Sequence, residues 1–277
     1  MTDSLPATHA SPSILGILSS VGSMFTPLGF PPAQPNHASE PYRPSRVGRG
    51  IPPIADIYLP PGPGPHPSMV LVHGGGWVIG HRRMKAMRHL ATTLVQAGYA
   101  VFVPEYRMVF RGGRLTEALD DATTAIAWWL DNAERFGLDR ARVSMSGLSA
   151  GATLMLLAAE QHRESGLASL LPVFGVYDFS DMHGGIGRLI RPLFLRGADP
   201  KSVSPLHMPP PACPVTLFHG TADTLVPYSQ AVALRDAWSA AGGTVELVTY
   251  PGLPHAYFNY SQSEGCRQAT SDYLAAL

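Results

Sequence analysis

Charged side chains are scarce in this sequence. Only 14% of its 277 residues are Asp, Glu, Lys or Arg, and the two signs balance at 20 each. A nucleic-acid-binding surface needs an excess of basic residues to meet phosphate, so we exclude nucleic acid as a partner. A short basic run, which we interpret as the solvated face of a helix, does not change this. It consists of Arg82, Arg83, Lys85 and Arg88.

Cysteine and the common cofactor motifs are also scarce. The two cysteines, Cys213 and Cys266, form neither a CxxC pair nor a group with neighbouring histidines. Two buried free thiols are favoured over a disulfide, and the sequence leaves the pairing open. There is no GxxxxGK[ST] phosphate loop and no HExxH zinc helix. His81 and His89 lie eight positions apart on a predicted helix, where a solvated face explains them better than a metal. We therefore expect neither metal nor cofactor.

Long apolar runs are absent, with one borderline case near the N-terminus. Residues 14 to 30 carry no charge, but no Lys or Arg precedes them and Pro27 interrupts the run. We predict no transmembrane segment and a cytoplasmic location. The apolar positions between Ile14 and Phe25 instead follow helical spacing and predict an amphipathic helix on the body of the protein, either as a roof over a ligand pocket or by simple packing. Contact with a membrane surface is disfavoured because basic residues are missing from its polar face.

What the sequence does contain is a regular alternation of short apolar runs and helical stretches. Such alternation predicts an α/β fold, with a mostly parallel sheet covered by helices on both faces. We expect strands at Ala55–Leu59, Met69–His73, Ala100–Pro104, Arg142–Met145, Leu170–Val176, Val215–Phe218 and Val245–Tyr250. We expect helices before Ala97, at Thr116–Phe136, at Ala150–Glu160 and after each of the last two strands.

The domain organisation follows from the interruptions of this rhythm. We predict an N-terminal amphipathic segment and linker over residues 1–50, and one catalytic domain over 51–277. Pro31–Pro53 is rich in Pro, Ser and Arg and predicts an extended connector. Asp178–Pro211 is rich in Gly and Pro and predicts an insertion or a small cap.

The strongest local motif is Gly-Leu-Ser-Ala-Gly at residues 147–151. It follows a predicted strand and opens a predicted helix, which is the setting of a nucleophile elbow. The turn is sharp, so small residues must flank Ser149, whose hydroxyl is then exposed. Alone the motif is weak, because a glycine-rich helix start also accounts for it.

A second motif, His-Gly-Gly-Gly-Trp at residues 73–77, follows another buried strand. Consecutive glycines let the backbone turn its N–H groups toward a ligand, as an acyl-transfer site needs for the negatively charged oxygen of its transition state. We expect His73 to brace this loop and Trp77 to serve packing rather than chemistry.

A nucleophilic serine needs a base and an orienting carboxylate. Among 11 histidines His255 is favoured because it follows the predicted strand ending at Tyr250. Asp223 directly follows the strand ending at Phe218 and is favoured over Asp178 and Asp181. Because ligands of parallel sheets bind where the strands end, these side chains are expected to meet.

Together these motifs make residues 56 to the C-terminus resemble the α/β-hydrolase superfamily, specifically the carboxylesterases related to hormone-sensitive lipase and to acetyl- and feruloyl-esterases. The resemblance implies oxyanion-hole N–H groups from Gly75, Gly76 and Ala150. The hormone-sensitive-lipase branch usually has Asp before its serine and a further Gly after the motif, whereas this chain has Leu148 and Ala152. Its acid also sits in a His-Gly-Thr-Ala-Asp motif (219–223) typical of the related esterases and exopeptidase-like members.

The resulting hypothesis is a serine carboxylesterase that cleaves short-to-medium acyl esters through Ser149, Asp223 and His255. An amidase, arylformamidase or small peptidase could use the same triad, so the motifs leave the bond type open. A non-catalytic ligand-binding protein on this scaffold is disfavoured because His255 is present. A small-molecule ester is the expected partner, and a homodimer stays open.

Overall fold

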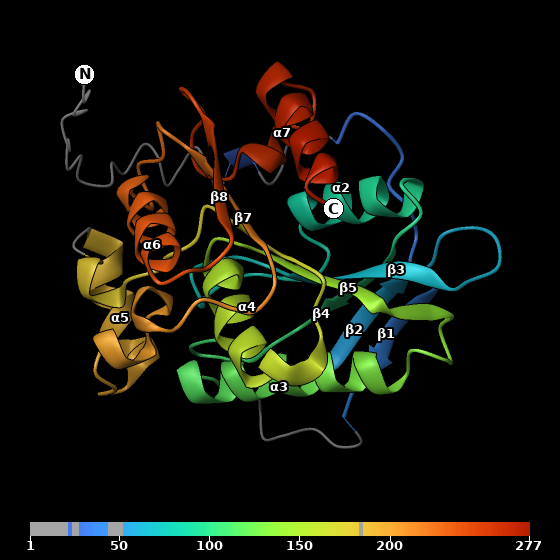
Figure 1. Ribbon diagram of the computed structural model, residues 1–277, viewed down its shortest axis with the longest axis horizontal. Coiled ribbons are helices and arrows are strands. Elements are labelled where there is room, and N and C mark those ends of the chain that lie inside the picture. Colours follow the sequence, from blue (N-terminus) through green and yellow to red (C-terminus); the bar gives the residue numbers. More distant parts are fainter. Residues whose placement is uncertain (1–21, 24–27, 44–51, 183–184) are drawn as a thin grey trace.

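The computed structural model describes residues 22–23, 28–43, 52–182 and 185–277. In this part of the chain, eight strands form one sheet in the order β1-β2-β4-β3-β5-β6-β7-β8 (Figure 1). The strands are β1 (His37–Pro41), β2 (Ile54–Tyr58), β3 (His66–Val72), β4 (Ala100–Pro104), β5 (Leu138–Leu148), β6 (Leu170–Val173), β7 (Val215–Gly220) and β8 (Val245–Tyr250).

Every neighbouring pair from β4 to β8 runs parallel, whereas β1 and β2 are antiparallel to their neighbours. The predicted mostly parallel α/β sheet is therefore confirmed. All five residues of β4 are buried, because helices cover both faces of the sheet at this point. This double burial explains why the central strands have continuous apolar sequences rather than alternating ones.

Strand β1 corrects the prediction of an extended connector over Pro31–Pro53. Its residues pair with β2, with His37 opposite Ile57 and Pro41 opposite Ile54. An edge strand is half exposed and needs few apolar residues, so the sequence His-Ala-Ser-Glu-Pro gives no strand signal. Part of the predicted N-terminal segment thus belongs to the sheet.

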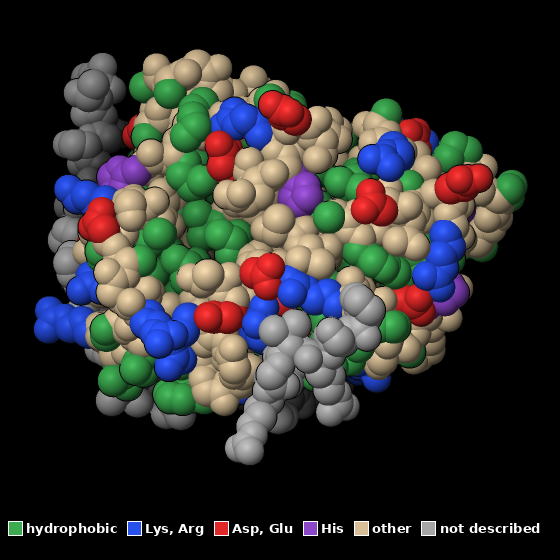
Figure 2. Space-filling view, turned by 90° about the horizontal axis from the view of Figure 1, so that it is seen from below, with side chains coloured by type: hydrophobic (Ala, Val, Ile, Leu, Met, Phe, Trp, Pro, Cys, Tyr) green, Lys and Arg blue, Asp and Glu red, His purple; other side chains and the backbone are tan. Residues whose placement is uncertain are grey.

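Two layers of helices enclose the sheet (Figure 1). Helices α2 (Lys85–Gln96) and α7 (Glu264–Ala275) pack on one face, where their apolar residues share a core with β3, β4 and β7. Helices α3 (Leu115–Asp131), α4 (Ala150–Gln161) and α6 (Ser229–Ala240) contribute to the core on the other face. Figure 2 views the molecule from below, on the side of α3, where charged side chains of both signs surround a group of hydrophobic ones. In the described part of the chain, no helix combines the length and the hydropathy that a membrane span requires.

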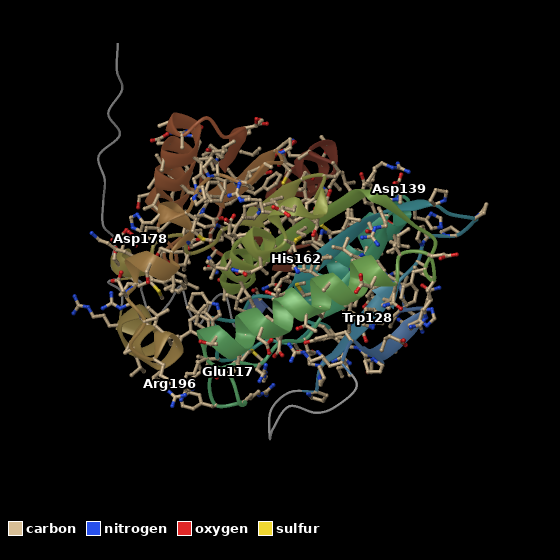
Figure 3. All side chains as sticks on the ribbon, turned by 60° about the horizontal axis from the view of Figure 1, so that its bottom comes forward. Glu117, Trp128, Asp139, His162, Asp178 and Arg196 are labelled. Atoms are coloured by element: carbon tan, nitrogen blue, oxygen red, sulfur yellow. The ribbon has the colours of Figure 1, made fainter. Side chains whose placement is uncertain are left out.

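The Gly- and Pro-rich stretch 178–211 connects β6 to β7. It contains α5 (Gly185–Leu195) and the short 3-10 helices η2 (Phe179–Asp181), η3 (Lys201–Val203) and η4 (Pro205–His207). In Figure 3, Asp178 and Arg196 mark this region on the side of the molecule where the N-terminal end of α3, marked by Glu117, also lies. The two remaining 3-10 turns are η1 (Arg163–Ser165) and η5 (Tyr257–Asn259).

The predicted amphipathic helix Ile14–Phe25 lies outside the described residues except for Gly22 and Ser23, which are helical. Ser23 is buried, and its Oγ accepts a hydrogen bond of 2.9 Å from Asn259 Nδ2. Asn259 belongs to η5, which follows the predicted base His255 by a few residues. Ser23 therefore packs beside the segment that carries His255.

Candidate active site

Ser149 sits in the sharp turn between β5 and α4, as the nucleophile-elbow motif predicts. Its backbone is left-handed, with φ 54° and ψ −121°, a conformation that L-residues rarely adopt. Gly147 and Gly151 are required by close packing. A Cβ on Gly147 would collide with the backbone of Gly151, and one on Gly151 would collide with the carbonyl groups of Val72 and His73. The two glycines thus let α4 start directly against β5 and β3.

The three residues singled out in the sequence meet at this turn. His255 Nε2 lies 3.0 Å from Ser149 Oγ, and His255 Nδ1 lies 2.6 Å from Asp223 Oδ2. Both distances are within hydrogen-bonding range. The Phe174 ring packs against the His255 imidazole with 4.7 Å between ring centroids, so the imidazole is held by packing as well as by hydrogen bonds.

Hydrogen-bond donors surround the carboxylate of Asp223. Its Oδ1 accepts bonds of 2.9 Å from the backbone N–H groups of Leu225 and Val226. Its Oδ2 faces His255 and also lies 3.2 Å from His219 Nε2. Burial alone would raise the pKa of Asp223, but attraction to His255 and hydrogen bonds from His219 and His255 lower it well below its ordinary value. The carboxyl group is therefore ionised at neutral pH.

The loops that carry Asp223 and His255 are fastened to each other. Thr221 N donates to Tyr250 O at 3.0 Å, Ala222 N donates to Leu253 O at 3.1 Å, and Gly252 N donates to Thr221 Oγ1 at 2.9 Å. Because β7 and β8 are parallel neighbours, their loops leave the sheet at the same edge. The register of this one strand pair thus sets the distance between acid and base.

The glycine loop after β3 faces the serine. A Cβ on Gly74 would come 2.7 Å from Leu148 O and 3.3 Å from the Ser149 Cβ, and the clash with the Leu148 carbonyl means that only glycine allows this approach. Gly75 and Gly76 have φ values of 122° and 60°, in the region that favours glycine. Among the described residues, none accepts a hydrogen bond from the N–H groups of Gly75, Gly76 or Ala150. These three groups remain available to a ligand.

A buried ion network supports this loop from behind. Glu105 Oε1 accepts bonds from Arg82 N and Arg82 Nη1 at 2.9 and 3.0 Å, and Glu105 Oε2 lies 3.3 Å from His73 Nε2. Arg82 Nε in turn lies 2.9 Å from Asp56 Oδ1. Burial alone would raise the pKa of Glu105, but the hydrogen bond from His73 and the charges around it lower it to about 2. His73 braces the loop, as expected, through its contacts with Glu105 and with Gly74 O.

Burial of three side chains corrects two interpretations of the sequence. The basic run predicts a solvated helix face, yet its Arg82 and Lys85 are buried, and Arg82 precedes α2 rather than lying on it. His89 is also buried, with Nε2 3.0 Å from Thr270 Oγ1. The sequence did not reveal Glu105 as a member of the site, because its partners are far away in the chain.

Trp77 serves packing, as expected. Its side chain is buried and stacks on Phe194 of α5 at 4.6 Å between ring centroids, with Phe179 at 5.4 Å. Ile190, on the same helix, lies 3.7 Å from the point where a Cβ on Gly76 would stand. Helix α5 therefore provides an apolar wall beside the free N–H groups of the glycine loop.

The rival carboxylates have other partners. Asp178 Oδ1 accepts bonds from Ser180 N and Ser180 Oγ at 2.8 and 2.6 Å and starts the turn of η2. Asp181 lies 3.5 Å from Gln230 Nε2 through its Oδ2. The structure thus brings Asp223, rather than either of these residues, to His255.

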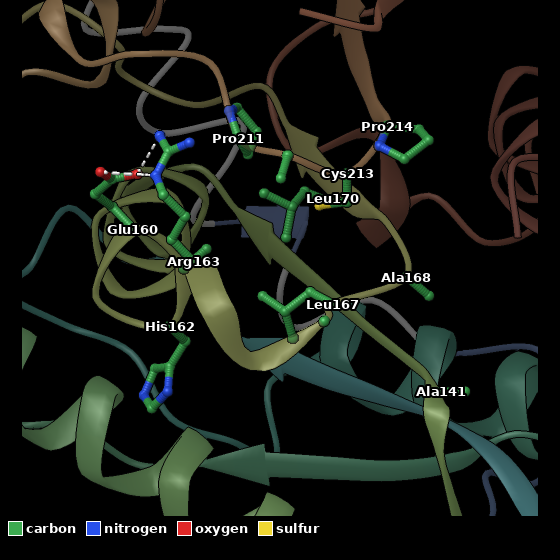
Figure 4. Close-up of a pocket in the computed structure, with 13 residues that line it drawn as sticks. Ala141, Glu160, His162, Arg163, Leu167, Ala168, Leu170, Pro211, Cys213 and Pro214 are labelled. Atoms are coloured by element: carbon green, nitrogen blue, oxygen red, sulfur yellow. Dashed lines mark hydrogen bonds and ion pairs between the residues drawn. The ribbon is translucent and has the colours of Figure 1, made fainter.

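A separate cleft of about 330 Å³ opens at the amino ends of β6 and β7 (Figure 4). Leu170 and Pro211 contribute apolar surface, and the Arg163–Glu160 ion pair lies beside it. Cys213, also in this cleft, is a free thiol whose pKa is raised by burial. Cys266 is a buried free thiol, so the prediction of two free thiols agrees with the structure, but the prediction that both are buried is wrong for Cys213, which is only partly buried.

Comparisons with known proteins agree with this geometry. Residues 55–182 match the BD-FAE family. A probable isoprenylcysteine alpha-carbonyl methylesterase from Oryza sativa subsp. japonica is 30% identical over 229 residues, which cover 72% of this chain and 53% of that protein. Esterase LipQ of Mycobacterium tuberculosis is 27% identical over 239 residues, which cover 76% and 55%. The chain thus spans about half the length of the curated relatives it matches.

Solved structures extend the similarity to nearly the whole fold. Thermogutta terrifontis esterase 2, phosphonylated by sarin, superimposes with a TM-score of 0.74 at 25% identity, covering 88% of this chain and 94% of that one. A hyperthermophilic esterase from Pyrobaculum calidifontis shares the fold, with a TM-score of 0.76 at 21% identity and coverages of 95% and 90%. The resemblance noted from the motifs is confirmed: this chain has the α/β-hydrolase fold of these solved esterases, and its residues 55–182 are similar to the BD-FAE family.

Proposed function

We propose that this protein is a carboxylesterase that hydrolyses short-to-medium acyl esters through Ser149, His255 and Asp223. The observation that carries the proposal is the continuous relay from Ser149 Oγ through the His255 imidazole to the Asp223 carboxylate, with distances of 3.0 and 2.6 Å. The N–H groups of Gly75, Gly76 and Ala150, which no described residue accepts from, support the proposal as its oxyanion donors. In this proposal the nucleophile, base, orienting acid and oxyanion donors meet at the carboxyl edge of the sheet.

In the first half of the reaction, Ser149 Oγ attacks the ester carbonyl carbon while His255 Nε2 takes the hydroxyl proton. The carbonyl oxygen becomes negatively charged and accepts hydrogen bonds from the N–H groups of the oxyanion hole. Asp223 holds the imidazole with its proton on Nδ1 and stabilises the cation that forms. When the tetrahedral intermediate collapses, His255 gives its proton to the leaving alcohol and an acyl-serine remains.

In the second half, water replaces the alcohol. His255 takes a proton from the water, whose oxygen attacks the acyl carbon, and the same N–H groups stabilise the second oxyanion. Collapse releases the carboxylic acid and returns the proton to Ser149. Ser149, His255 and Asp223 therefore act in both acylation and deacylation, and the same arrangement of side chains serves both steps.

Apolar surface beside the oxyanion hole supports the proposed acyl length. Ile190 and the Trp77–Phe194 stack border the glycine loop, where an apolar part of the substrate would be desolvated. A structure of the Thermogutta terrifontis esterase holds propionate, a short acyl acid. Propionate would be released from either an ester or an amide, so it indicates only the acyl length, whereas the methylesterase and esterase relatives favour esters for this chain.

The test is hydrolysis of p-nitrophenyl acetate and butyrate by the wild type and by Ser149→Ala. We expect the substitution to lower kcat by about 10⁵-fold or more with an unchanged melting temperature. Ser165→Ala, at an exposed serine, is the control and should keep wild-type activity. Activity that survives Ser149→Ala would refute the assignment.

A matched ester and anilide distinguish the carboxylesterase from the amidase or peptidase. We expect kcat/KM on an ester to exceed that on the matched anilide, and the reverse result would favour an amidase or peptidase. A folded wild type with no activity on either substrate would favour the non-catalytic binding protein.

A further inference from the structure

A second histidine contacts the carboxylate of the proposed triad. His219, at the end of β7, is fully buried, and its Nε2 lies 3.2 Å from Asp223 Oδ2 and 3.0 Å from the backbone oxygen of Val226. Oδ2 is the same oxygen that faces His255 Nδ1. One carboxylate oxygen thus lies between two imidazoles.

The surroundings of His219 indicate which ring nitrogen carries the proton of its neutral form. Nδ1 is buried and has no hydrogen-bond partner among the described residues, whereas Nε2 faces two acceptors, a carbonyl and a carboxylate. A neutral imidazole carries one proton, and only a proton on Nε2 can be shared with these oxygens. The ring is further enclosed by Tyr228, at 5.9 Å between ring centroids in an edge-on arrangement. In the described part of the chain, the titratable groups with a contact to His219 are Asp223 and Tyr228, and His255 contacts the same carboxylate oxygen.

We propose that His219 is a positioning residue that acts through Asp223: the N–H of its Nε2 donates to Val226 O and also faces Oδ2 at 3.2 Å, which keeps this carboxylate oxygen directed at His255. This inference rests on the proposed function. The donated bond fixes the rotation of the Asp223 side chain together with the two backbone N–H groups on Oδ1. It also withdraws charge from Oδ2, so that the carboxylate stabilises the His255 cation without binding its proton too tightly.

Two substitutions of similar polarity distinguish positioning from simple packing. In His219→Gln the amide nitrogen stands near the original Nε2 position and can still donate to Asp223. In His219→Asn the amide is shorter and ends near the original Nδ1, away from the carboxylate. His89→Asn, at a buried histidine that contacts Thr270 rather than the triad, is the control for loss of a buried ring.

We expect His219→Asn to lower kcat by about 10- to 100-fold with KM within about two-fold of the wild type, as second-layer residues of catalytic sites typically do. The acidic limb of its kcat/KM profile should move to higher pH, because a carboxylate with one donor fewer stabilises the imidazolium more strongly. His219→Gln should restore most of kcat and the wild-type profile, and His89→Asn should leave the profile unchanged.

Three results would overturn the inference: an unchanged pH profile in active His219→Asn, equal impairment of the Gln and Asn variants, or loss of folding in both. Failure of the proposed function would look different, because the wild type itself would then lack Ser149-dependent ester hydrolysis.

Discussion

The two edges of the parallel strands β5, β6 and β7 contrast in backbone conformation. At the carboxyl edge, non-glycine residues adopt positive φ: Ser149 at 54° and Phe174 at 38°, with Ala256 at 57° beside the base. At the amino edge the positive φ values of the neighbouring turns belong to glycines, Gly137 at 62° and Gly166 at 70°. A left-handed L-residue costs about 1–2 kcal/mol, and glycine avoids that cost.

The polar contacts differ in the same way. The carboxyl-edge loops are held by buried groups, with Glu105 behind the glycine loop and His219 behind Asp223. The cleft at the amino edge contains an Arg163–Glu160 pair that is partly exposed, and exposed pairs contribute little to stability. Strained backbone and buried charge therefore occur together where the chemistry is proposed, which is the pattern of a preorganised site.

Among the variants that test this contrast between the two edges, Asp223→Asn is expected to lower kcat the most. The amide of asparagine favours the wrong tautomer of His255 and does not stabilise its cation, so kcat should fall by about 10⁴-fold. Steady-state kinetics on p-nitrophenyl butyrate measures this fall. Asp178→Asn is the matched control and should retain activity within a few-fold. Equal losses in the two variants would show that the acid has been misassigned.

A smaller effect is expected for Glu105→Gln. Without the charge of Glu105 behind it, the glycine loop should hold its N–H groups less firmly. In other enzymes, loss of one oxyanion donor lowers kcat by about 10²–10³-fold. Because Glu105→Gln weakens the loop without removing a donor, we expect kcat to fall by about 10- to 100-fold. Glu160→Gln, at the amino edge, should leave kcat unchanged.

The same residue should influence acid stability. The pKa of Glu105 is lowered to about 2 from 4.5, so its contribution is complete above pH 4.5 and is lost as the pH falls toward 2. That contribution amounts to at most about 3 kcal/mol. Chemical denaturation between pH 7 and pH 3 should therefore give a shallower loss of unfolding free energy for Glu105→Gln than for the wild type. Parallel curves would contradict the role of the ionised carboxylate.

Still smaller is the effect expected for Ile190→Ala. Removing this side chain enlarges the space beside Gly76, so kcat/KM on an eight-carbon acyl ester, relative to acetate, should rise by about 5- to 10-fold. Leu189→Ala, at the exposed neighbour on α5, is the control and should keep the wild-type ratio. An unchanged ratio in Ile190→Ala would place the acyl group elsewhere.

The smallest effect is expected at the amino edge. Cys213→Ser should leave kcat/KM within about two-fold of the wild type, because the thiol lies in the cleft remote from the triad. A larger loss in an otherwise stable variant would show that the two edges are coupled.

The sequence predicted that the three residues of the proposed triad meet, because each lies within a few residues after an apolar run. In a parallel sheet the carboxyl ends of all strands share one edge, so Ser149, Asp223 and His255 were expected to meet without knowledge of their contacts. The glycines around Ser149 were informative for the same reason, since their small size is required locally. Strand β6 ends at Val173 rather than Val176 because Phe174 turns away with positive φ, which the apolar run Leu170–Val176 does not reveal.

Other features depend on contacts between distant parts of the chain. Glu105, Arg82 and Asp56 come from three separate segments, and an arginine beside a predicted helix ordinarily faces solvent. Strand β1 is stabilised by backbone pairing with β2 at a half-exposed edge, so its polar sequence carries no signal. These features could not be predicted from the sequence, because they depend on contacts with residues that are distant in the chain and not on local structure.

The most direct test of the central claim is labelling with a fluorophosphonate probe, followed by peptide mass spectrometry. We predict one equivalent of phosphonate per chain, attached to Ser149, with strongly slowed labelling in Asp223→Asn and none in Ser149→Ala. A folded wild type that stays unmodified, or that is modified at another serine, would contradict the proposed nucleophile.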